Sequence, residues 1–274
     1  MKKNNSVLLS TPYILWMLAF TLIPLGVVGY YALTDPDTGA FTFSNLKDLG
    51  MYAGVLWQSI GYALASALIC LLLGYPVAYY IAHRKPLTQK ILYMLIMLPM
   101  CMSFLLRTLA WVGLLQDTGI LNTLLQRLGL GTLRLIRTPG AVVLGMVYNY
   151  LPYMILPLYS TIVKIDSRLI EAAEDLGCNG VQVFGRVILP LSIPGILSGI
   201  TMVFVPAVST FYISQKLGGT DTVLIGDLIE RQFKQADNPN LGAALSLVLM
   251  VLVFVCTDIM NRFGDADEED GVIV

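Results

Sequence analysis

The segment Val55–Ala82, VLWQSIGYALASALICLLLGYPVAYYIA, is apolar over its whole length and contains no Asp, Glu, Lys or Arg. A helix needs about 20 such residues to cross the hydrocarbon core of a bilayer. Five further stretches have the same character, and the expected spans are Pro12–Leu33, Val55–Ala82, Ile91–Leu115, Gly140–Val163, Val187–Ile213 and Leu241–Thr257. The sequence therefore predicts an all-α fold, a polytopic transmembrane helical bundle of six spans.

The overall composition agrees with a protein that is embedded in lipid. Of the 274 residues, 56% are hydrophobic and 13% are charged, whereas about a quarter of the residues of a soluble domain are charged. The spans contain nearly all of the apolar residues, so we expect one membrane domain over residues 12–262. A short N-terminus, 1–11, and an acidic tail, 263–274, flank it. The net charge of −1 argues against nucleic acid as a partner.

Residues for metal binding or catalysis are scarce. The four cysteines, Cys70, Cys101, Cys178 and Cys256, form no CxxC pair, and we interpret them as small buried apolar residues. His83 is the single histidine, which argues against a zinc site. The chain also lacks the G-x-x-x-x-G-K-[ST] loop that binds nucleotide phosphates. We therefore expect no metal site, no catalytic residue and no enzymatic activity in this chain.

The distribution of basic residues predicts the orientation in the membrane. Lysine and arginine are enriched in short cytoplasmic loops, and the short connection from Arg84 to Lys90 is basic. This favours cytoplasmic N- and C-termini. Arg107 is the one charged residue well inside an expected span. Ion-coupled carriers usually bury carboxylates there, so secondary transport is disfavoured. For Arg107 we expect a structural role, with its side chain reaching the interface or capping carbonyls of a neighbouring helix.

The connection Gln116–Pro139 contains an amphipathic pattern. Its four leucines at helical spacing are Leu121, Leu124, Leu125 and Leu128, and they share one face beside Asn122, Gln126 and Arg127. Such a helix lies along a membrane surface or covers an outer vestibule. A plain connecting helix is the alternative.

A second connection, Lys164–Pro190, reads KIDSRLIEAAEDLGCNGVQVFGRVILP. The pattern predicts two short helices separated by a glycine break, with Ser167 as the cap of the first and Gly177 and Gly180 in the turn. Val183 and Phe184 are expected to form an apolar knob at the membrane surface. A charged helical hairpin of this kind suits the docking of a cytoplasmic partner.

This connection resembles the EAA loop of ABC importer permeases. Glu171, Ala172, Ala173, Gly177, Leu189 and Pro190 match the family pattern, with Phe184 between them and Val187 where the family usually has isoleucine. The resemblance implies a type I, MetI-like ABC importer permease in the bacterial inner membrane. It also implies that the hairpin docks into a cytoplasmic ATPase, and that this partner binds ATP and magnesium.

Two further stretches narrow the resemblance. LPMCMSFLLRTLAW at 98–111 and PAVSTFYIS at 206–214 are similar to the PotB-type spermidine/putrescine permease family, and the likeness extends from Pro12 to Arg262. The family implies two ATP-binding subunits, a second similar permease and an extracytoplasmic polyamine-binding protein as partners. Some relatives have an acidic residue near Gln215, where this chain has Gln215-Lys216, which puts a role of that position in cation binding in doubt.

A polyamine is a flexible polycation, so its path should offer aromatic faces and carboxylates. The candidate lining residues are Trp111, Tyr148, Tyr150, Tyr153, Phe211 and Tyr212. Each is alternatively a packing residue or a member of the interfacial aromatic belt. Four acidic residues of the outer segments are candidates for attracting a cation or the binding protein: Asp117, Asp221, Asp227 and Glu230.

Other functions stay open from the sequence alone. Within the same fold, the solute of an importer is alternatively ferric ion, sulfate or thiamine. A membrane enzyme and a stand-alone channel are the alternatives of another class. The missing catalytic residues argue against the enzyme, and the docking hairpin argues against the channel.

Overall fold

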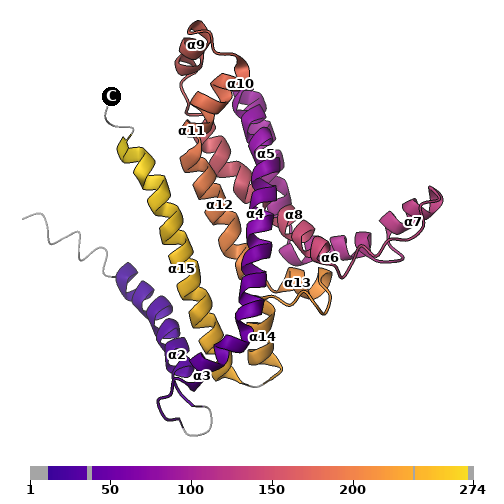
Figure 1. Cartoon of the computed structure of the whole chain (residues 1–274), viewed down its shortest axis with the longest axis vertical. Helices are drawn as coiled ribbons and strands as arrows, with labels where there is room; N and C mark the ends of the chain where they lie inside the picture. The colour runs from indigo at the N-terminus through magenta and orange to yellow at the C-terminus, as the bar shows by residue number, and fades with distance from the viewer. Residues whose placement is uncertain (1–11, 36–38, 237, 271–274) are drawn as a thin grey trace, which may run out of the picture. The chain divides into compact units, whose positions relative to one another are not determined.

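The computed structural model describes residues 12–35, 39–236 and 238–270. In these ranges the chain is helical apart from its connections and one isolated antiparallel bridge between Thr34 and Phe41, which confirms the all-α class. The N-terminus 1–11 and the last tail residues, 271–274, lie outside them, and the backbone of 263–270 continues the final helix. Figure 1 shows the helices with their labels. Their bounds are η1 Leu18–Leu22, α2 Ile23–Ala32, α3 Ser44–Lys47, η2 Asp48–Tyr52, α4 Ala53–Ala82, α5 Pro86–Met97, η3 Leu98–Cys101, α6 Phe104–Leu115, α7 Ile120–Arg127, α8 Pro139–Ile162, α9 Ser167–Asp175, α10 Gly180–Val183, η4 Phe184–Ile188, α11 Leu189–Leu191, α12 Ile193–Val208, α13 Tyr212–Leu217, α14 Ile225–Lys234 and α15 Pro239–Asp270.

Among the described residues, four uninterrupted helical stretches are long and apolar enough to cross a bilayer: Pro12–Ala32, Leu49–Ala82, Pro139–Ile162 and Pro239–Met260. Two more pairs of helices meet this criterion together but are bent, Pro86–Cys101 with Phe104–Arg127 and Gly180–Leu191 with Ile193–Val208. The predicted count of six spans is therefore reached only when each bent pair is one span.

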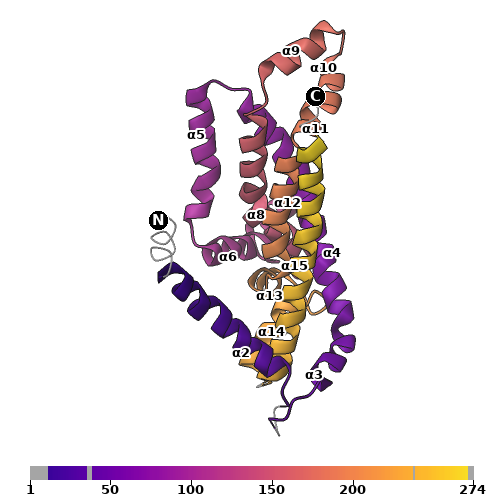
Figure 2. The ribbon, with the colours of Figure 1, turned by 90° about the vertical axis from the view of Figure 1, so that its left-hand side faces the viewer.

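The expectation of a continuous helix over Ile91–Leu115 is wrong. The helix direction changes by 85° between Cys101 and Phe104, and Figure 2 shows the turn from α5 into α6. Met102 and Ser103 leave the helical region, with ψ angles of 147° and 130°. Pro99 lies in the 3-10 turn before them, where its missing N–H already removes a helical hydrogen bond. The apolar pattern continues through this corner, so hydrophobicity alone did not reveal it.

The fifth expected span, Val187–Ile213, is also interrupted. The chain bends by 63° near Ser192, where Pro190 and Pro194 flank the bend and cannot donate helical hydrogen bonds. The Ser192 hydroxyl donates to the carbonyl of Leu189 at 2.8 Å and lies 2.9 Å from the hydroxyl of Tyr75 on α4. α12 ends at Val208, and α13 starts separately at Tyr212.

The chain divides into two compact units. The first consists of residues 1–54 and 228–252. In its described part, Ala32 packs with Ala243 and Ala244 of α15. The side-chain amides of Asn45 and Asn240 both donate to the carbonyl of Thr34, at 2.9 and 2.6 Å. These bonds satisfy the backbone at the end of α2, where helical partners are missing.

The second unit consists of residues 55–227 and 253–274 and contains most of the predicted functional residues. Its centre is the contact of α8 with α12, which lie side by side. Close approach depends on small residues. A Cβ atom on Gly199 of α12 would lie 2.6 Å from the Sδ atom of Met154 on α8. Because glycine has no side chain, Met154 packs directly against the backbone of α12 at this position, as small residues allow in membrane helices.

Candidate functional site

The hairpin 164–190 has the two short helices that the sequence predicts, α9 and α10. The cap of α9 is Asp166, whose carboxylate accepts from the N–H of Arg168 at 3.0 Å. Ser167, the expected cap, is instead the first helical residue. Aspartate and serine cap helices about equally well, so the sequence pattern did not separate these neighbours.

Gly177 ends α9 and turns the chain. Its φ of +87° lies in the left-handed region, and its N–H donates to the carbonyl of Glu174 at 2.8 Å. Glycine adopts this conformation at little cost. Gly180 opens α10 without a positive φ. The turn is completed by Asn179, which exchanges two 2.9 Å hydrogen bonds with Gln182 in a capping box.

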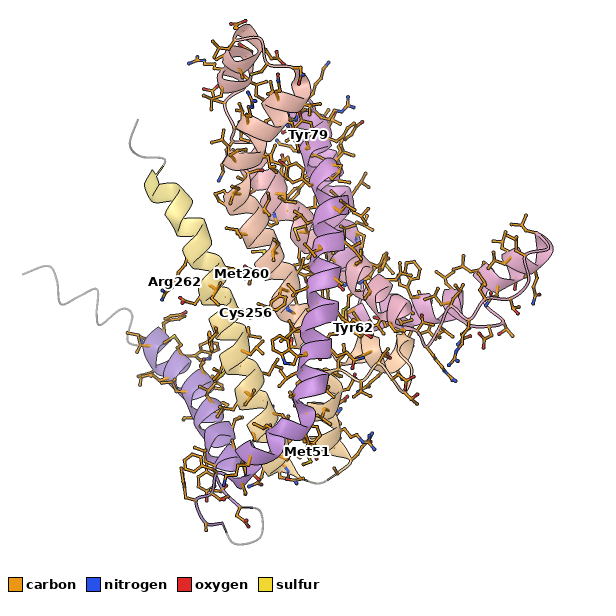
Figure 3. All side chains as sticks on the ribbon, in the orientation of Figure 1. Met51, Tyr62, Tyr79, Cys256, Met260 and Arg262 are labelled. Atoms are coloured by element: carbon orange, nitrogen blue, oxygen red, sulfur yellow. The ribbon has the colours of Figure 1, made fainter. Side chains whose placement is uncertain are left out.

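The interior of the hairpin is a small apolar cluster of Ala173, Val183 and Ile188. Phe184 was expected to be an exposed knob with Val183, but Val183 is buried and Phe184 is half-buried. The Phe184 ring lies edge-on to Tyr75 and Tyr79 of α4, with centroids 5.5 and 6.0 Å away. Figure 3 labels Tyr79, near α10. Phe184 thus ties the hairpin to α4.

The outward surface of the hairpin combines apolar and acidic side chains. Glu171 and Ala172 are exposed, whereas Ala173 is buried beneath them. Leu169 and Leu176 share the exposed face of Ala172, because residues spaced by three and four lie together on a helix. Leu176 is 86% exposed and Val181 of α10 is 81% exposed. The helical period of 169, 172 and 176 could have revealed this stripe from the sequence. Leu189 and Pro190, at the base of the hairpin, are also exposed.

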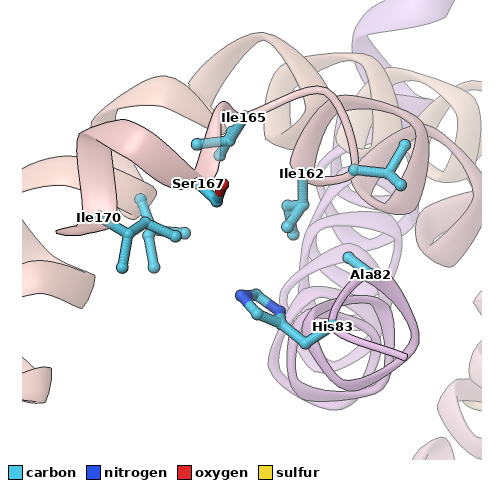
Figure 4. A pocket seen from close by; sticks show the side chains of 8 residues that line it. Ala82, His83, Ile162, Ile165, Ser167 and Ile170 are labelled. Atoms are coloured by element: carbon cyan, nitrogen blue, oxygen red, sulfur yellow. The ribbon is translucent and has the colours of Figure 1, made fainter. Parts of the chain in front are cut away.

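A cavity of about 140 Å³ lies between α9 and the ends of α4 and α8. Figure 4 shows His83 and Ser167 at this cavity, among the apolar side chains Ile162, Ile165 and Ile170. The Nδ1 atom of His83 lies 2.9 Å from the carbonyl of Tyr79, and the two rings are 4.2 Å apart. Tyr79 therefore connects His83 with Phe184.

The candidate substrate-path aromatics come from α6, α8 and the α12–α13 corner, and α6, α8 and α13 pack against one another. The rings of Trp111 and Tyr148 are 5.4 Å apart, in an edge-to-face arrangement. Tyr148 is exposed, as are two further members of the set, Tyr153 and Phe211. Tyr212 lies 6.2 Å from Phe104, and the ammonium of Lys216 is 5.7 Å from the Tyr212 ring centre. Most of the predicted set thus gathers on neighbouring helices.

Tyr150 is the buried member of the set, although its ring centre lies 6.4 Å from that of Tyr153. The Tyr150 hydroxyl donates to the carbonyl of Pro206 at 3.3 Å. Pro206 lies in the last turn of α12, which ends at Val208. Carbonyl groups in a last turn lack helical N–H partners, and the Tyr150 hydroxyl supplies a partner for that of Pro206. Its position favours the packing alternative that the sequence left open.

Arg107 lies on the inner side of α6 and is only 7% exposed. Its Nε and Nη1 atoms are buried and have no hydrogen-bond partner among the described residues. The expected capping of neighbouring carbonyls is therefore not seen at these two nitrogens. Burying polar atoms without a hydrogen-bond partner costs free energy, so Arg107 is an uncompensated polar residue of this unit, as is Asn149 at its Oδ1 atom.

A family model described as "Binding-protein-dependent transport system inner membrane component" matches residues 71–267, which include the hairpin and both bent helix pairs. The chain belongs to this family.

Relatives of this permease are close in sequence. The spermidine/putrescine transport system permease protein PotB of Haemophilus influenzae is 40% identical over 247 residues, which cover 87% of this chain and 86% of the relative. PotB of Escherichia coli K12 is 38% identical over 87% of this chain and 90% of the relative. The inner membrane ABC transporter permease protein YdcU of the same strain is 29% identical, with 90% and 85% covered.

Solved structures support the fold of the permease. A chain of a bacterial ABC transporter involved in the import of the acidic polysaccharide alginate matches with a TM-score of 0.80 and 18% identity, covering 95% of this chain and 94% of that chain. A chain of the MetNI methionine ABC transporter, in an inward-facing conformation, matches with a TM-score of 0.61 and 15% identity, covering 81% of this chain and 98% of that chain. The predicted type I, MetI-like permease fold is confirmed.

The acidic candidates of the permease have different surroundings. The carboxylate of Asp227 accepts from the N–H of Leu224 at 2.9 Å, and Glu230 is paired with Lys234 at 2.7 Å. Asp117 lines a cavity of about 480 Å³ together with Arg137 and Lys216. Arg137 has a φ of +59°, a conformation that costs a non-glycine residue about 1 kcal/mol or more. Asp117 thus lines a cavity beside two basic side chains.

Proposed function

We propose that this chain is the membrane-spanning permease subunit of an ATP-driven importer of polyamines, spermidine and putrescine. The observation that carries the solute is the 40% identity to a spermidine/putrescine permease over 87% of this chain. In this proposal ATP and magnesium are bound by a partner ATPase, and this chain contributes no catalytic residue, cofactor or metal site.

The hairpin supports the coupling role. Its exposed stripe of Leu169, Ala172 and Leu176, beside the carboxylate of Glu171, offers an ATPase an apolar contact with an acidic rim. Gly177 sets the turn, Ala173 fills the interior, and Phe184 carries movement to Tyr75 and Tyr79. Leu189 and Pro190 join the hairpin to the bend at Ser192. Movement of a docked ATPase would thereby reach both α4 and α12.

The aromatic residues support a substrate path for a polycation. Trp111, Tyr148, Tyr153, Phe211 and Tyr212 are the proposed lining, because ammonium groups are attracted to aromatic faces. Tyr150 is assigned to packing. Asp117 is the acidic residue proposed to meet the cation at the outer cavity.

The proposed assembly contains two ATP-binding subunits, a second similar permease and an extracytoplasmic polyamine-binding protein. The chain is multi-pass in the bacterial inner membrane, with both termini and the hairpin 164–190 in the cytoplasm. The permease domain is 12–262, between the N-terminus 1–11 and the acidic tail 263–274. The positive-inside distribution around Arg84–Lys90 supports this orientation.

The test is uptake by the assembled transporter in vesicles loaded with ATP. Labelled spermidine, putrescine, ferric ion, sulfate and thiamine are offered separately, each with its own binding protein. The proposal predicts ATP-dependent accumulation of a polyamine. Accumulation of another solute without either polyamine would overturn the assignment of the solute and leave the importer role intact.

A further inference from the structure

The connection between α6 and α8 forms a closed arm, here called the α7 arm, residues 119–135. α7 leads outward and the segment after it returns. Asn122 is almost fully buried, and its amide joins the two sides. Its Nδ2 donates to the carbonyl of Leu133 at 2.9 Å, and its Oδ1 accepts from the N–H of Leu133 at 3.0 Å. These hydrogen bonds hold the two sides of the arm together. Figure 1 shows α7 extending away from the contact of α8 with α12.

One side of the arm is apolar and uncovered. Ile120, Leu124 and Leu128 follow one another at intervals of four residues and are 62%, 52% and 69% exposed. Leu121 on the same side is exposed as well, and so are Leu130 and Leu133 of the returning segment. Asn122 and Gln126 occupy the opposite side of α7. This many exposed leucines indicate that something outside the chain covers this side of the arm.

The bend after α5 gives the direction of the arm. Pro86–Cys101 is about 24 Å long at 1.5 Å per residue, most of the hydrocarbon thickness of about 30 Å. α6 and α7 then continue at 85° to it. A helix at a right angle to a membrane-crossing helix runs in the plane of the bilayer. The arm precedes α8 and the hairpin follows α8, so with the hairpin in the cytoplasm, as the proposed function has it, the arm lies on the extracytoplasmic side.

The charged residues of the arm are all basic. Arg127 and Arg134 lie in it, and no Asp or Glu occurs between Asp117 and Asp166. Both arginines are exposed, and neither forms an ion pair in the part of the chain that the structure describes. Leucines on one side of a helix with arginine at its border are the pattern of helices that lie in a membrane interface and attract anionic lipids.

We propose that the α7 arm lies in the outer leaflet, with Ile120, Leu124 and Leu128 among the upper acyl chains and Arg127 and Arg134 on the phosphates of anionic lipids. The occupant of its apolar side is lipid. The arm thereby fixes the height of α6, which carries Arg107 and Trp111, at the bilayer boundary. This inference concerns the membrane contact and does not depend on which solute is transported.

Spin labels on the assembled transporter test the occupant. Leu124→Cys and Gln126→Cys are placed separately in a background with the four native cysteines replaced by serine, in vesicles of phosphatidylcholine and phosphatidylglycerol. We expect the label at 124 to be accessible to oxygen, which concentrates in lipid, and shielded from a water-soluble nickel chelate. The label at 126 serves as the control and should lack the oxygen preference. A label at 124 shielded from both reagents would overturn the proposal in favour of a protein partner, and nickel access would overturn it in favour of water.

The lipid charge is tested with the same label. In vesicles that contain phosphatidylglycerol, the label at 124 should report greater depth than in phosphatidylcholine alone. The double substitution Arg127→Gln and Arg134→Gln should abolish this difference, whereas Lys234→Gln, outside the arm, should preserve it. An equal depth in both lipids for the unsubstituted arm would refute the role of the arginines. Uptake measured in parallel shows whether the labelled transporters are intact.

Discussion

The Phe184 ring of the hairpin meets the Tyr75 ring of α4 edge-on, with the centroids 5.5 Å apart and the planes at 84°. The hydroxyl of Tyr75 in turn lies 2.9 Å from the Ser192 hydroxyl, at the bend before α12. One side chain of α4 therefore contacts both the hairpin and the bent helix. In the proposed importer this contact passes movement of the ATPase into the membrane helices.

Replacing Phe184 with Ala should uncouple the transporter. Each edge-to-face pair contributes about 0.5–1.5 kcal/mol beyond its buried area, and Phe184 makes two. We expect spermidine uptake to fall several-fold while the partner ATPase continues to hydrolyse ATP. Phe254→Ala is the matched control, because Phe254 is exposed on α15. Equal loss of uptake in both variants would show that the ring contacts have no special part in coupling.

Replacing Leu176 with Asp should weaken docking of the ATPase without unfolding the permease. Leu176 is highly exposed in the single chain, and surface substitutions usually change stability by less than about 0.5 kcal/mol. Burying a leucine in an interface contributes about 1.5–3 kcal/mol, so the affinity for the ATPase should fall about tenfold or more. Co-purification and titration measure this, and Leu176→Met should retain binding. Unchanged affinity of the Asp variant would exclude Leu176 from the docking surface.

The pair Tyr75 and Ser192 should be coupled in stability. Tyr75→Phe and Ser192→Ala each remove one hydroxyl from the 2.9 Å contact, and a hydrogen bond contributes about 0.5–1.5 kcal/mol. A double-mutant cycle of thermal unfolding in detergent should give a coupling energy of about 1 kcal/mol. Additive effects of the two substitutions would mean that the hydroxyls do not stabilise the bend together.

The substrate path predicts different kinetics for two neighbouring tyrosines of α8. Tyr148→Ala removes an exposed ring that contacts Trp111 and should raise the KM for spermidine several-fold. Tyr150→Phe removes a buried hydroxyl bonded to Pro206 and should lower the melting temperature with little change of KM. The opposite pattern would exchange the roles assigned to these residues.

The membrane character was predictable because each span must bury its own backbone hydrogen bonds in lipid, and that needs a long apolar run. The bends between α5 and α6 and before α12 were not predictable in the same way. The residues around Met102 and Ser192 are as apolar as the helices beside them, and proline is tolerated in many membrane helices. Tertiary contacts such as that of Tyr75 with Ser192 decide whether the chain bends there.

The hairpin was predicted closely because its turn depends on local residue types. Gly177 adopts the positive φ that its position demands, and Asp166 rather than Ser167 supplies the cap. The inward direction of Phe184 could not be read from the local pattern, because its partners Tyr75 and Tyr79 are distant in sequence. Burial of Tyr150 and of Arg107 likewise depends on the packing of α6, α8 and α12.

Replacing Arg107 with Met should stabilise the isolated permease. Nε and Nη1 are buried without an acceptor, and substituting buried charges with apolar side chains of similar size often raises stability by about 1–4 kcal/mol. The melting temperature in detergent should therefore rise. A lower melting temperature would mean that the guanidinium makes stabilising contacts, for example with lipid or detergent headgroups.

The central claim is that the hairpin couples a partner ATPase to polyamine import, and the most direct measurement is the amount of spermidine accumulated per ATP hydrolysed by the reconstituted transporter. We expect a measurable ratio for the wild type, and a strongly reduced ratio for Phe184→Ala with hydrolysis still present. ATP hydrolysis without any spermidine accumulation by the wild type, or an unchanged ratio in the variant, would contradict it.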